Sequence, residues 1–455
     1  VAPEDTATLR ALADLAGETG QRDEQLRHLR RILTLYPQSK EVRAYVEYLS
    51  PSKPRFDESL AWDRDRLLEL AKRPAGRESR RTLRNLAVTT VYSNGLASRF
   101  RQVVFQPLTE EAAASSRQFG FGYQGDRQEV ELRLSRVYRK DGTVAEAIES
   151  GEAAANDPSI AMYTSGRSFY VQFPRLSPGD VVELRYRIDD VGRTNEVADS
   201  FGEIETLQSD EPIASSEYVL LVPKERAITT FVTGLEGVEQ EKRTEGEQVL
   251  HRFTAKDVPA RSAEPAMPPW SEVLGQVHVS TFGSWEELGR WYWGLARDQL
   301  DVDDEVRKAV QRATQGLSSD ADKVRAVYRL ATELRYVALE FGIEGIKPRR
   351  CALTLARGWG DCKDKATVIV TMLRELGIDA QLVLVRTQQR GDLPKGAPPS
   401  IAAFDHAIAY VPSLDLYLDG TAEGSGSTEL PAMDRGAVAL VVDPKGARLV
   451  RLPDP

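Results

Sequence analysis

The chain has 455 residues, a length that predicts about three domains. Hydrophobic residues make up 41% and charged residues 28% of it, which excludes an intrinsically disordered chain. The formal net charge of −9 argues against a nucleic-acid binder. No segment approaches the roughly 18 apolar residues of a membrane-spanning helix. The chain begins with Val1 rather than Met, which indicates a fragment or a processed product, so the missing targeting signal says little about its compartment.

Residues 1–52 have a helical pattern. Apolar residues recur at helical spacing in two stretches separated near Gly20, Pro37 follows the second, and a third stretch ends at Leu49. This pattern is typical of one tetratricopeptide-like repeat with its following helix, and a plain helical hairpin is the alternative. Stacked repeats need neighbours, so we expect a longer array upstream and a protein partner for this segment.

Residues 53–260 have a β-rich pattern after the linker Ser50–Pro54, with one helix expected over residues 60–72. Alternating apolar residues and turn signals such as Asp141-Gly142 and Pro178-Gly179-Asp180 separate short strands. Strands without helical periodicity between them predict an antiparallel β-sandwich-like domain. No residue of this region is a candidate for catalysis.

Residues 261–455 combine helices and strands after a proline-rich connection near residues 260–270. Helices are expected around Trp285, over Asp303–Ala313 and over Asp320–Leu334, where Ser319 is a suitable N-cap. An extended segment is expected over Tyr336–Glu340. The region is therefore predicted to be an α+β domain of helices packed on an antiparallel sheet.

The run Gly-Trp-Gly-Asp-Cys-Lys-Asp-Lys-Ala over residues 358–366 is the most specific motif. Apolar residues follow it at i, i+3, i+4 and i+7 as far as Gly377, so a helix is expected to begin at Asp361 or Cys362. Free backbone N–H groups and the helix dipole at that end stabilise a thiolate. Cys362 is therefore the candidate nucleophile. Lys363–Lys365 are expected to be helix-terminal charges and packing partners, not catalysts.

Two polar residues downstream complete a possible thiol site. His406 begins an alternating strand and Asp419 ends the next one, so both are expected on adjacent antiparallel strands. His406 would be the general base, and Asp419 would hold its ring in the correct tautomer. Each residue also has an ordinary structural alternative: an inert buried cysteine, a hydrogen-bonded core histidine and an aspartate that starts a turn.

From these residues, the chain resembles the bacterial transglutaminase-like superfamily, whose core is related to the papain-type peptidase fold. The Gly-Asp-Cys-Lys-Asp-Lys-Ala run, His406 and the Asp-Gly-Thr run at 419–421 carry the resemblance. Residues 55–260 resemble a β-rich domain of unknown function that often precedes it. The resemblance implies that Cys362, His406 and Asp419 form a catalytic triad. Related architectures are often exported, which points to the bacterial cell envelope or periplasm.

The predicted function is thiol-dependent acyl transfer or hydrolysis at amide bonds of a protein or peptide substrate, through a thioester. The alternative is a non-catalytic scaffold that binds partners. The backbone N–H of Cys362 is the first candidate for the oxyanion hole, with Trp359 or Tyr336 as a possible side-chain donor. Cys351 is expected to pack in the core, because a disulfide to Cys362 would block the nucleophile. No Cys-x-x-Cys or His-x-x-x-His pair occurs, so we expect neither a metal nor a cofactor.

Overall fold

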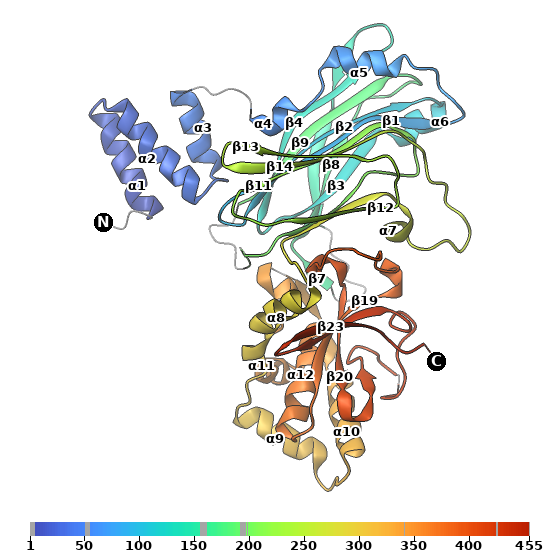
Figure 1. Ribbon diagram of the computed structural model, residues 1–455. Helices are drawn as coiled ribbons and strands as arrows, with labels where there is room; N and C mark the ends of the chain where they lie inside the picture. The colour runs from blue at the N-terminus through green and yellow to red at the C-terminus, as the bar shows by residue number, and fades with distance from the viewer. Residues whose placement is uncertain are drawn as a thin grey trace.

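Three groups of elements follow one another along the chain: a small helical group, a large β-rich region and an α/β core (Figure 1). The computed structural model describes residues 5–50, 55–154, 162–191, 197, 199–340, 342–424 and 426–454. The core lies below the β-rich region in the figure, and the helical group lies at the side of that region. This arrangement confirms the predicted multidomain α+β class.

The helical group consists of α1 (Thr6–Glu18), α2 (Arg22–Leu35) and α3 (Lys40–Leu49). Leu9, Leu29 and Val42 bury one apolar face of each helix in a shared small core. The group is attached to the β-rich region through the Tyr36 hydroxyl, which donates to the Val191 carbonyl at 2.5 Å. Its tetratricopeptide character and its protein partner stay predictions.

The largest element of the β-rich region is an eight-stranded sheet. All neighbouring strands are antiparallel except β1 and β11, which are parallel. In spatial order the strands are β13 (Glu239–Glu245), β14 (Gln248–Val258), β11 (Ile213–Pro223), β1 (Arg80–Val91), β2 (Ala97–Pro107), β9 (Val181–Asp190), β4 (Gln128–Tyr138) and β5 (Val144–Glu146).

Two three-stranded sheets cover one face of the large sheet, which makes the region a sandwich. One holds β3 (Gln118–Gln124), β8 (Gly166–Gln172) and β6 (Glu149–Ala154); the other holds β10 (Gly202–Thr206), β15 (Gln276–Ser280) and β12 (Thr229–Thr233). Phe121 stacks on Tyr186 in the first interface, and Val277 meets Tyr218 and Leu220 in the second. Because β15 pairs with β10 and β12, the sandwich includes a strand that lies beyond residue 260 in the sequence.

Short helices cover the opposite face of the large sheet. They are α4 (Phe56–Ser59) and α5 (Arg64–Ala71), while α6 (Glu110–Ser115) and α7 (Trp270–Val273) connect strands elsewhere. Leu67 of α5 is fully buried against Leu83, Val104 and Val181 of the sheet. The apolar side chains on both faces of the large sheet are thus covered, by strands on one face and by helices on the other.

The α/β core contains a five-stranded antiparallel sheet with helices on one face. Its strands, in spatial order, are β21 (Leu416–Leu418), β20 (His406–Val411), β19 (Gln381–Arg386), β22 (Val438–Asp443) and β23 (Gly446–Arg451). The helices are α8 (Trp285–Ala296), α9 (Asp304–Thr314), α10 (Asp320–Glu333), α11 (Cys351–Arg357) and α12 (Cys362–Glu375). Ser284, Asp303 and Ser319 cap α8, α9 and α10, each by accepting a backbone N–H of the first turn.

Helix α12 lies at the centre of this core. Ile369, Val370 and Leu373 pack against the sheet residues Leu384, Ala409 and Leu440 and against neighbouring helices. Short strands β16 (Arg335–Tyr336), β17 (Ala338–Glu340) and β18 (Trp359–Gly360) precede it, and β17 pairs with β7 (Met162–Thr164) of the β-rich region. Helix α12 is therefore packed between the sheet and the neighbouring helices, and short paired strands lead into its N-terminus.

Candidate functional site

The backbone before Cys362 is shaped by two glycines. Gly358 ends α11 in the left-handed conformation, with φ of 71°, which favours glycine. Gly360 allows a close approach, because a Cβ there would lie 2.7 Å from the Asp364 Cβ and 2.9 Å from the Thr354 Cγ2. Asp361 then caps α12, and its side chain accepts the backbone N–H of Asp364 at 3.2 Å. Cys362 is consequently the first residue of the helix, as the sequence predicts.

A buried network of charges fixes this helix start. The Asp364 side chain accepts the backbone N–H groups of Arg349 at 2.7 Å and of Asp361 at 3.3 Å, which completes a capping box. The Arg349 guanidinium donates at 3.1 Å to the Asp364 Oδ2, the oxygen that also accepts the Asp361 N–H, and Lys363 pairs with Asp361 at 2.5 Å. The side chains of Lys363, Asp364 and Lys365 are buried at the helix start, where they pack as well as carry charge.

Cys362 is half-buried, whereas Cys351 is fully buried, and both thiols are free. Cys351 packs in the helical core, and burial raises the pKa of its thiol to about 12. Tyr292 of α8 lies near the helix start. Its burial, together with the charges of Cys362 and Asp361, raises its pKa. Cys362 is therefore the more accessible of the two thiols.

The sheet brings His406 and Asp419 together. His406 is the first residue of β20, and Asp419 directly follows β21, the antiparallel neighbour of that strand. The His406 Nε2 lies 3.2 Å from the Asp419 Oδ2. The backbone N–H and hydroxyl of Thr421 both donate to the Asp419 Oδ1 at 2.8 Å. Two hydrogen bonds from Thr421 thus hold one oxygen of the Asp419 carboxylate, and its other oxygen faces the imidazole ring.

The imidazole of His406 also connects to the cysteine. Burial by itself lowers the pKa of His406, but the neighbouring Asp419 and Cys362 side chains outweigh it and raise that pKa well above the ordinary value. Burial likewise raises the pKa of Asp419, while the hydrogen bond and charge of His406 reverse the effect and lower it. The geometry thus brings together the three side chains that the sequence analysis selects, from one helix and two strands.

Two further buried groups, which the sequence analysis does not select, border the same site. The fully buried Lys365 donates from its Nζ to the Gly420 carbonyl at 3.1 Å, next to Asp419. Asp434, also fully buried, has an Oδ2 4.0 Å from the His406 Nε2. It lies in the loop before β22, and the turn-like run Pro-Ala-Met-Asp-Arg-Gly around it carries no catalytic signal.

The suggested oxyanion donors lie around the helix start. The backbone N–H of Cys362 is at the first position of α12, where no intrahelical acceptor exists. Tyr336 pairs with Gly360 between β16 and β18, and Trp359 is the residue before that glycine. All three residues therefore come from segments next to the thiol, and their role in binding an oxyanion stays a prediction.

One group of side chains has the composition of a metal site. One nitrogen of His406 and one oxygen each of Asp419 and Asp434 lie within 4.8 Å of one another. No metal is expected from the sequence, because these residues have no ligand spacing there. The three groups are close enough to share either a cation or a proton.

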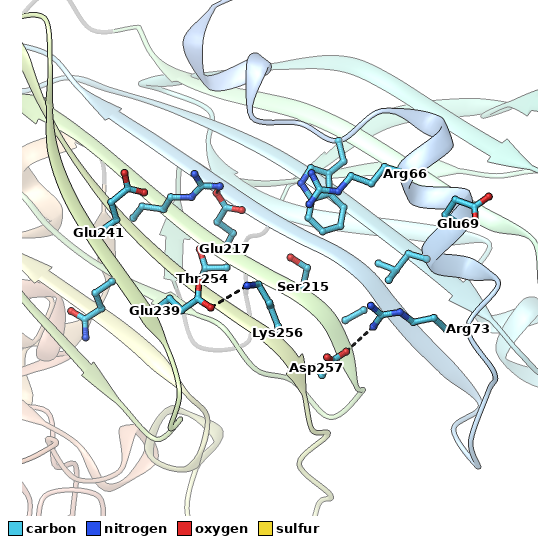
Figure 2. Close-up of a pocket in the computed structure, with 15 residues that line it drawn as sticks. Arg66, Glu69, Arg73, Ser215, Glu217, Glu239, Glu241, Thr254, Lys256 and Asp257 are labelled. Atoms are coloured by element: carbon cyan, nitrogen blue, oxygen red, sulfur yellow. Dashed lines mark hydrogen bonds and ion pairs between the residues drawn. The ribbon is translucent and has the colours of Figure 1, made fainter.

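A separate cavity of about 750 Å³ lies on the helix-covered face of the large sheet (Figure 2). Strands β11, β14 and β13 form its floor, and α5 borders it. Figure 2 shows ion pairs across its lining, between Lys256 and Glu239 at 3.0 Å and between Arg73 and Asp257 at 2.8 Å. None of the three predicted site residues lines this cavity, and its mixed, paired charges do not select a ligand.

A free cysteine at the start of a central helix, packed on an antiparallel sheet that carries a histidine and an aspartate, defines the fold class of thiol-type hydrolases and acyltransferases. Residues 307–415 match the family model of the transglutaminase-like superfamily. Residues 93–262 match DUF3857, a domain of unknown function with a solved structure. The chain thus joins a DUF3857 domain to a transglutaminase-like domain, as the resemblance in the sequence implies.

A solved structure shares this architecture. A "putative protease" from Parabacteroides distasonis superposes with a TM-score of 0.67 at 18% identity, over 83% of this chain and 72% of that one. A "putative cysteine protease" from Cytophaga hutchinsonii covers 49% of this chain and 75% of its own, at 14% identity and a TM-score of 0.22. The first match confirms the fold. No curated protein matches the chain.

Within the described ranges, we find no helix that combines the length and the apolar character needed to cross a membrane.

Proposed function

We propose that the chain is a thiol-dependent enzyme that acts on amide bonds of a protein or peptide substrate. Cys362 is the nucleophile, His406 the general acid and base, and Asp419 the group that orients His406. The observation that carries the proposal is the position of one imidazole. The His406 Nε2 lies 3.2 Å from the Asp419 Oδ2, and Cys362 is close enough to help raise the pKa of His406.

The two nitrogens of this ring have different roles in proton transfer. Asp419 keeps a proton on Nε2, so Nδ1 is the nitrogen that accepts the proton of the Cys362 thiol. The sulfur attacks the carbonyl carbon, a C–S bond forms, and the C–N bond breaks as His406 returns the proton to the leaving amine. The resulting thioester is the acyl-enzyme. The free N–H at the start of α12 is suited to stabilise the oxyanion.

The molecule that accepts the acyl group from the thioester decides between two outcomes of the same chemistry. Water would release a carboxylic acid, as in a peptidase or amidase, and an amine would give a new amide, as in a transglutaminase. The structural neighbour described as a "putative protease" favours a peptide bond as the substrate. Release of acid from a peptide library without added amine would show hydrolysis, whereas incorporation of a labelled primary amine would show transfer.

The test is the pH dependence of Cys362 alkylation by iodoacetamide in the full chain. The Cys351→Ser background removes the second thiol. We expect fast alkylation near neutral pH, and a decrease of at least tenfold in His406→Ala and Asp419→Ala, because the imidazole no longer takes up the thiol proton. His28→Ala removes a histidine of α2, in the helical group, and is the matched control that should leave the rate unchanged.

An unreactive Cys362, or one that is equally reactive without His406, would refute the triad. The domain would then be a scaffold, and partner capture with the intact chain would be the experiment to pursue. Circular dichroism of each variant shows whether it is still folded. A folded variant with slow alkylation has lost the proton acceptor and not the structure.

A further inference from the structure

The position of Asp434 is unusual for an ionised carboxylate. Its side chain is fully buried, and neither of its oxygens accepts a hydrogen bond from a described residue. Asp419, by contrast, accepts two hydrogen bonds from Thr421 and faces His406. A buried carboxylate without donors loses its hydration and gains nothing in return, so the charged form of Asp434 is strongly disfavoured.

The surroundings supply an acceptor for a proton on Asp434. The oxygens of Asp419 and Asp434 belong to one cluster with His406, with ligand atoms within 4.8 Å of one another. Two carboxylates this close in a buried site cannot both remain ionised at low cost, and the one with fewer donors keeps the proton. A neutral Asp434 can donate that proton to Asp419, which would satisfy the remaining acceptor capacity of Asp419.

The charged groups that face Asp434 agree with this assignment. Burial raises its pKa to about 7, the charge of His406 opposes the rise, and the charges of Asp419 and Asp405 add to it. Asp405, just before β20, is itself held by Thr387, whose N–H and hydroxyl donate to it at 2.9 and 2.8 Å, and lies 3.7 Å from Arg390. Among these described groups, His406 is the one whose charge directly favours ionisation of Asp434.

We propose that Asp434 is a positioning residue of the thiol site, a neutral carboxylic acid that donates a hydrogen bond to Asp419 and so fixes the carboxylate that orients His406. This inference rests on the proposed function, because it assigns Asp434 to the same site. It acts through Asp419 and does not touch the reacting atoms. Above the pH at which Asp434 ionises, a second negative charge appears beside His406 and the hydrogen bond to Asp419 is lost.

The experiment compares Asp434→Asn with Asp434→Leu in the full chain with Cys351→Ser. Asparagine can donate an N–H to Asp419 but cannot ionise. Leucine can neither donate a hydrogen bond nor ionise. We expect the wild-type rate of Cys362 alkylation to show an inflection near pH 7 that Asp434→Asn lacks. At pH 6 we expect Asp434→Asn to keep the rate within threefold, and Asp434→Leu to lower it at least tenfold.

A second readout does not depend on the reactivity of Cys362. The ¹³C chemical shift of the Asp434 side-chain carboxyl, assigned by its absence in Asp434→Asn, should titrate near pH 7. Titration at an ordinary carboxyl pKa of about 4 would overturn the inference. So would an Asp434→Leu profile identical to that of the wild type when the wild-type Cys362 is reactive. If the wild-type Cys362 is inert while Asp434 titrates near pH 7, the proposed function is refuted, and the positioning role with it. Only the conclusion that Asp434 and Asp419 share a proton would then stand.

A third arm distinguishes a proton from a cation. The same alkylation is repeated with EDTA and with added Zn²⁺. A rate that is insensitive to both agrees with the shared proton. Zn²⁺ inhibition that EDTA reverses and that Asp434→Asn abolishes would assign the cluster to a cation and overturn the inference.

Discussion

Replacing Arg349 by methionine should destabilise the α/β core strongly. The Arg349 side chain is 6% exposed and pairs with Asp364, which is fully buried, at 3.1 Å. Removing one partner of a buried ion pair leaves an uncompensated charge and costs about 3–5 kcal/mol. The backbone N–H groups of Arg349 and Asp361 still donate to Asp364 in the variant. We therefore expect the lower end of that range, about 3 kcal/mol.

Cys351 provides the assay for this prediction. It is fully buried in the core that α11 and α12 share, so a thiol reagent reaches it only when the core opens. In a Cys362→Ser background, the labelling rate of Cys351 reports the free energy of opening. Since about 1.4 kcal/mol corresponds to a tenfold change, Arg349→Met should accelerate labelling more than about 100-fold.

The control and the second variant make the reasoning refutable. Arg312→Met removes an exposed arginine of α9 in the same helical layer, and labelling should change less than about fivefold, because surface substitutions cost little. Adding Asp364→Asn to Arg349→Met should recover part of the loss, because the unpaired charge disappears. An acceleration below tenfold in Arg349→Met, or no recovery in the double variant, would show that the ion pair does not stabilise the start of α12.

Two other substitutions test the packing and the protonation of the core. Gly289→Ala should destabilise it by about 1–3 kcal/mol in urea unfolding, because a Cβ at this position of α8 would lie 2.2 Å from the Ala447 Cβ. Gly294→Ala in the same helix has no atom within 4 Å and should be neutral or more stable; equal losses in both would contradict the packing argument. The folded pKa of Asp434, about 7, lies above its ordinary 3.8, so the folded state holds the extra proton and wild-type stability is lost as pH rises between these values. Asp434→Asn should therefore gain stability relative to the wild type from pH 4 to pH 8, by up to about 4 kcal/mol, and parallel pH profiles would contradict it.

The start of α12 could be predicted from local sequence. Asp361 as the cap, Cys362 as the first helical residue and Gly377 as the end follow from patterns within a few residues. The capping-box partner Asp364 and its ion pair with Arg349 could not be predicted. A charged residue in the first helical turn has the same local pattern whether it faces solvent or a buried partner. Only the packing of α10, α11 and β20 around α12 shows that these charges are inside.

Non-local pairings are the other part that the sequence does not reveal. The parallel pairing of β1 with β11 joins strands far apart in the chain, and β15 joins the sandwich from beyond the proline-rich connection. Asp434 is missed for the same reason. It lies in a loop whose pattern indicates only a turn, and the return of the chain into β22 brings it to His406.

The charge balance of the buried cluster connects the fold with the proposed chemistry. With Asp434 neutral and Asp419 ionised, the set carries one negative charge when Cys362 is a thiol and His406 is neutral. Transfer of the proton from Cys362 to His406 creates a thiolate and an imidazolium and leaves that total unchanged. Activation of the thiol therefore buries no additional net charge, whereas an ionised Asp434 would impose a second negative charge in both states. A buried acid beside the orienting carboxylate is thus consistent with a site in which only the proton between Cys362 and His406 needs to move.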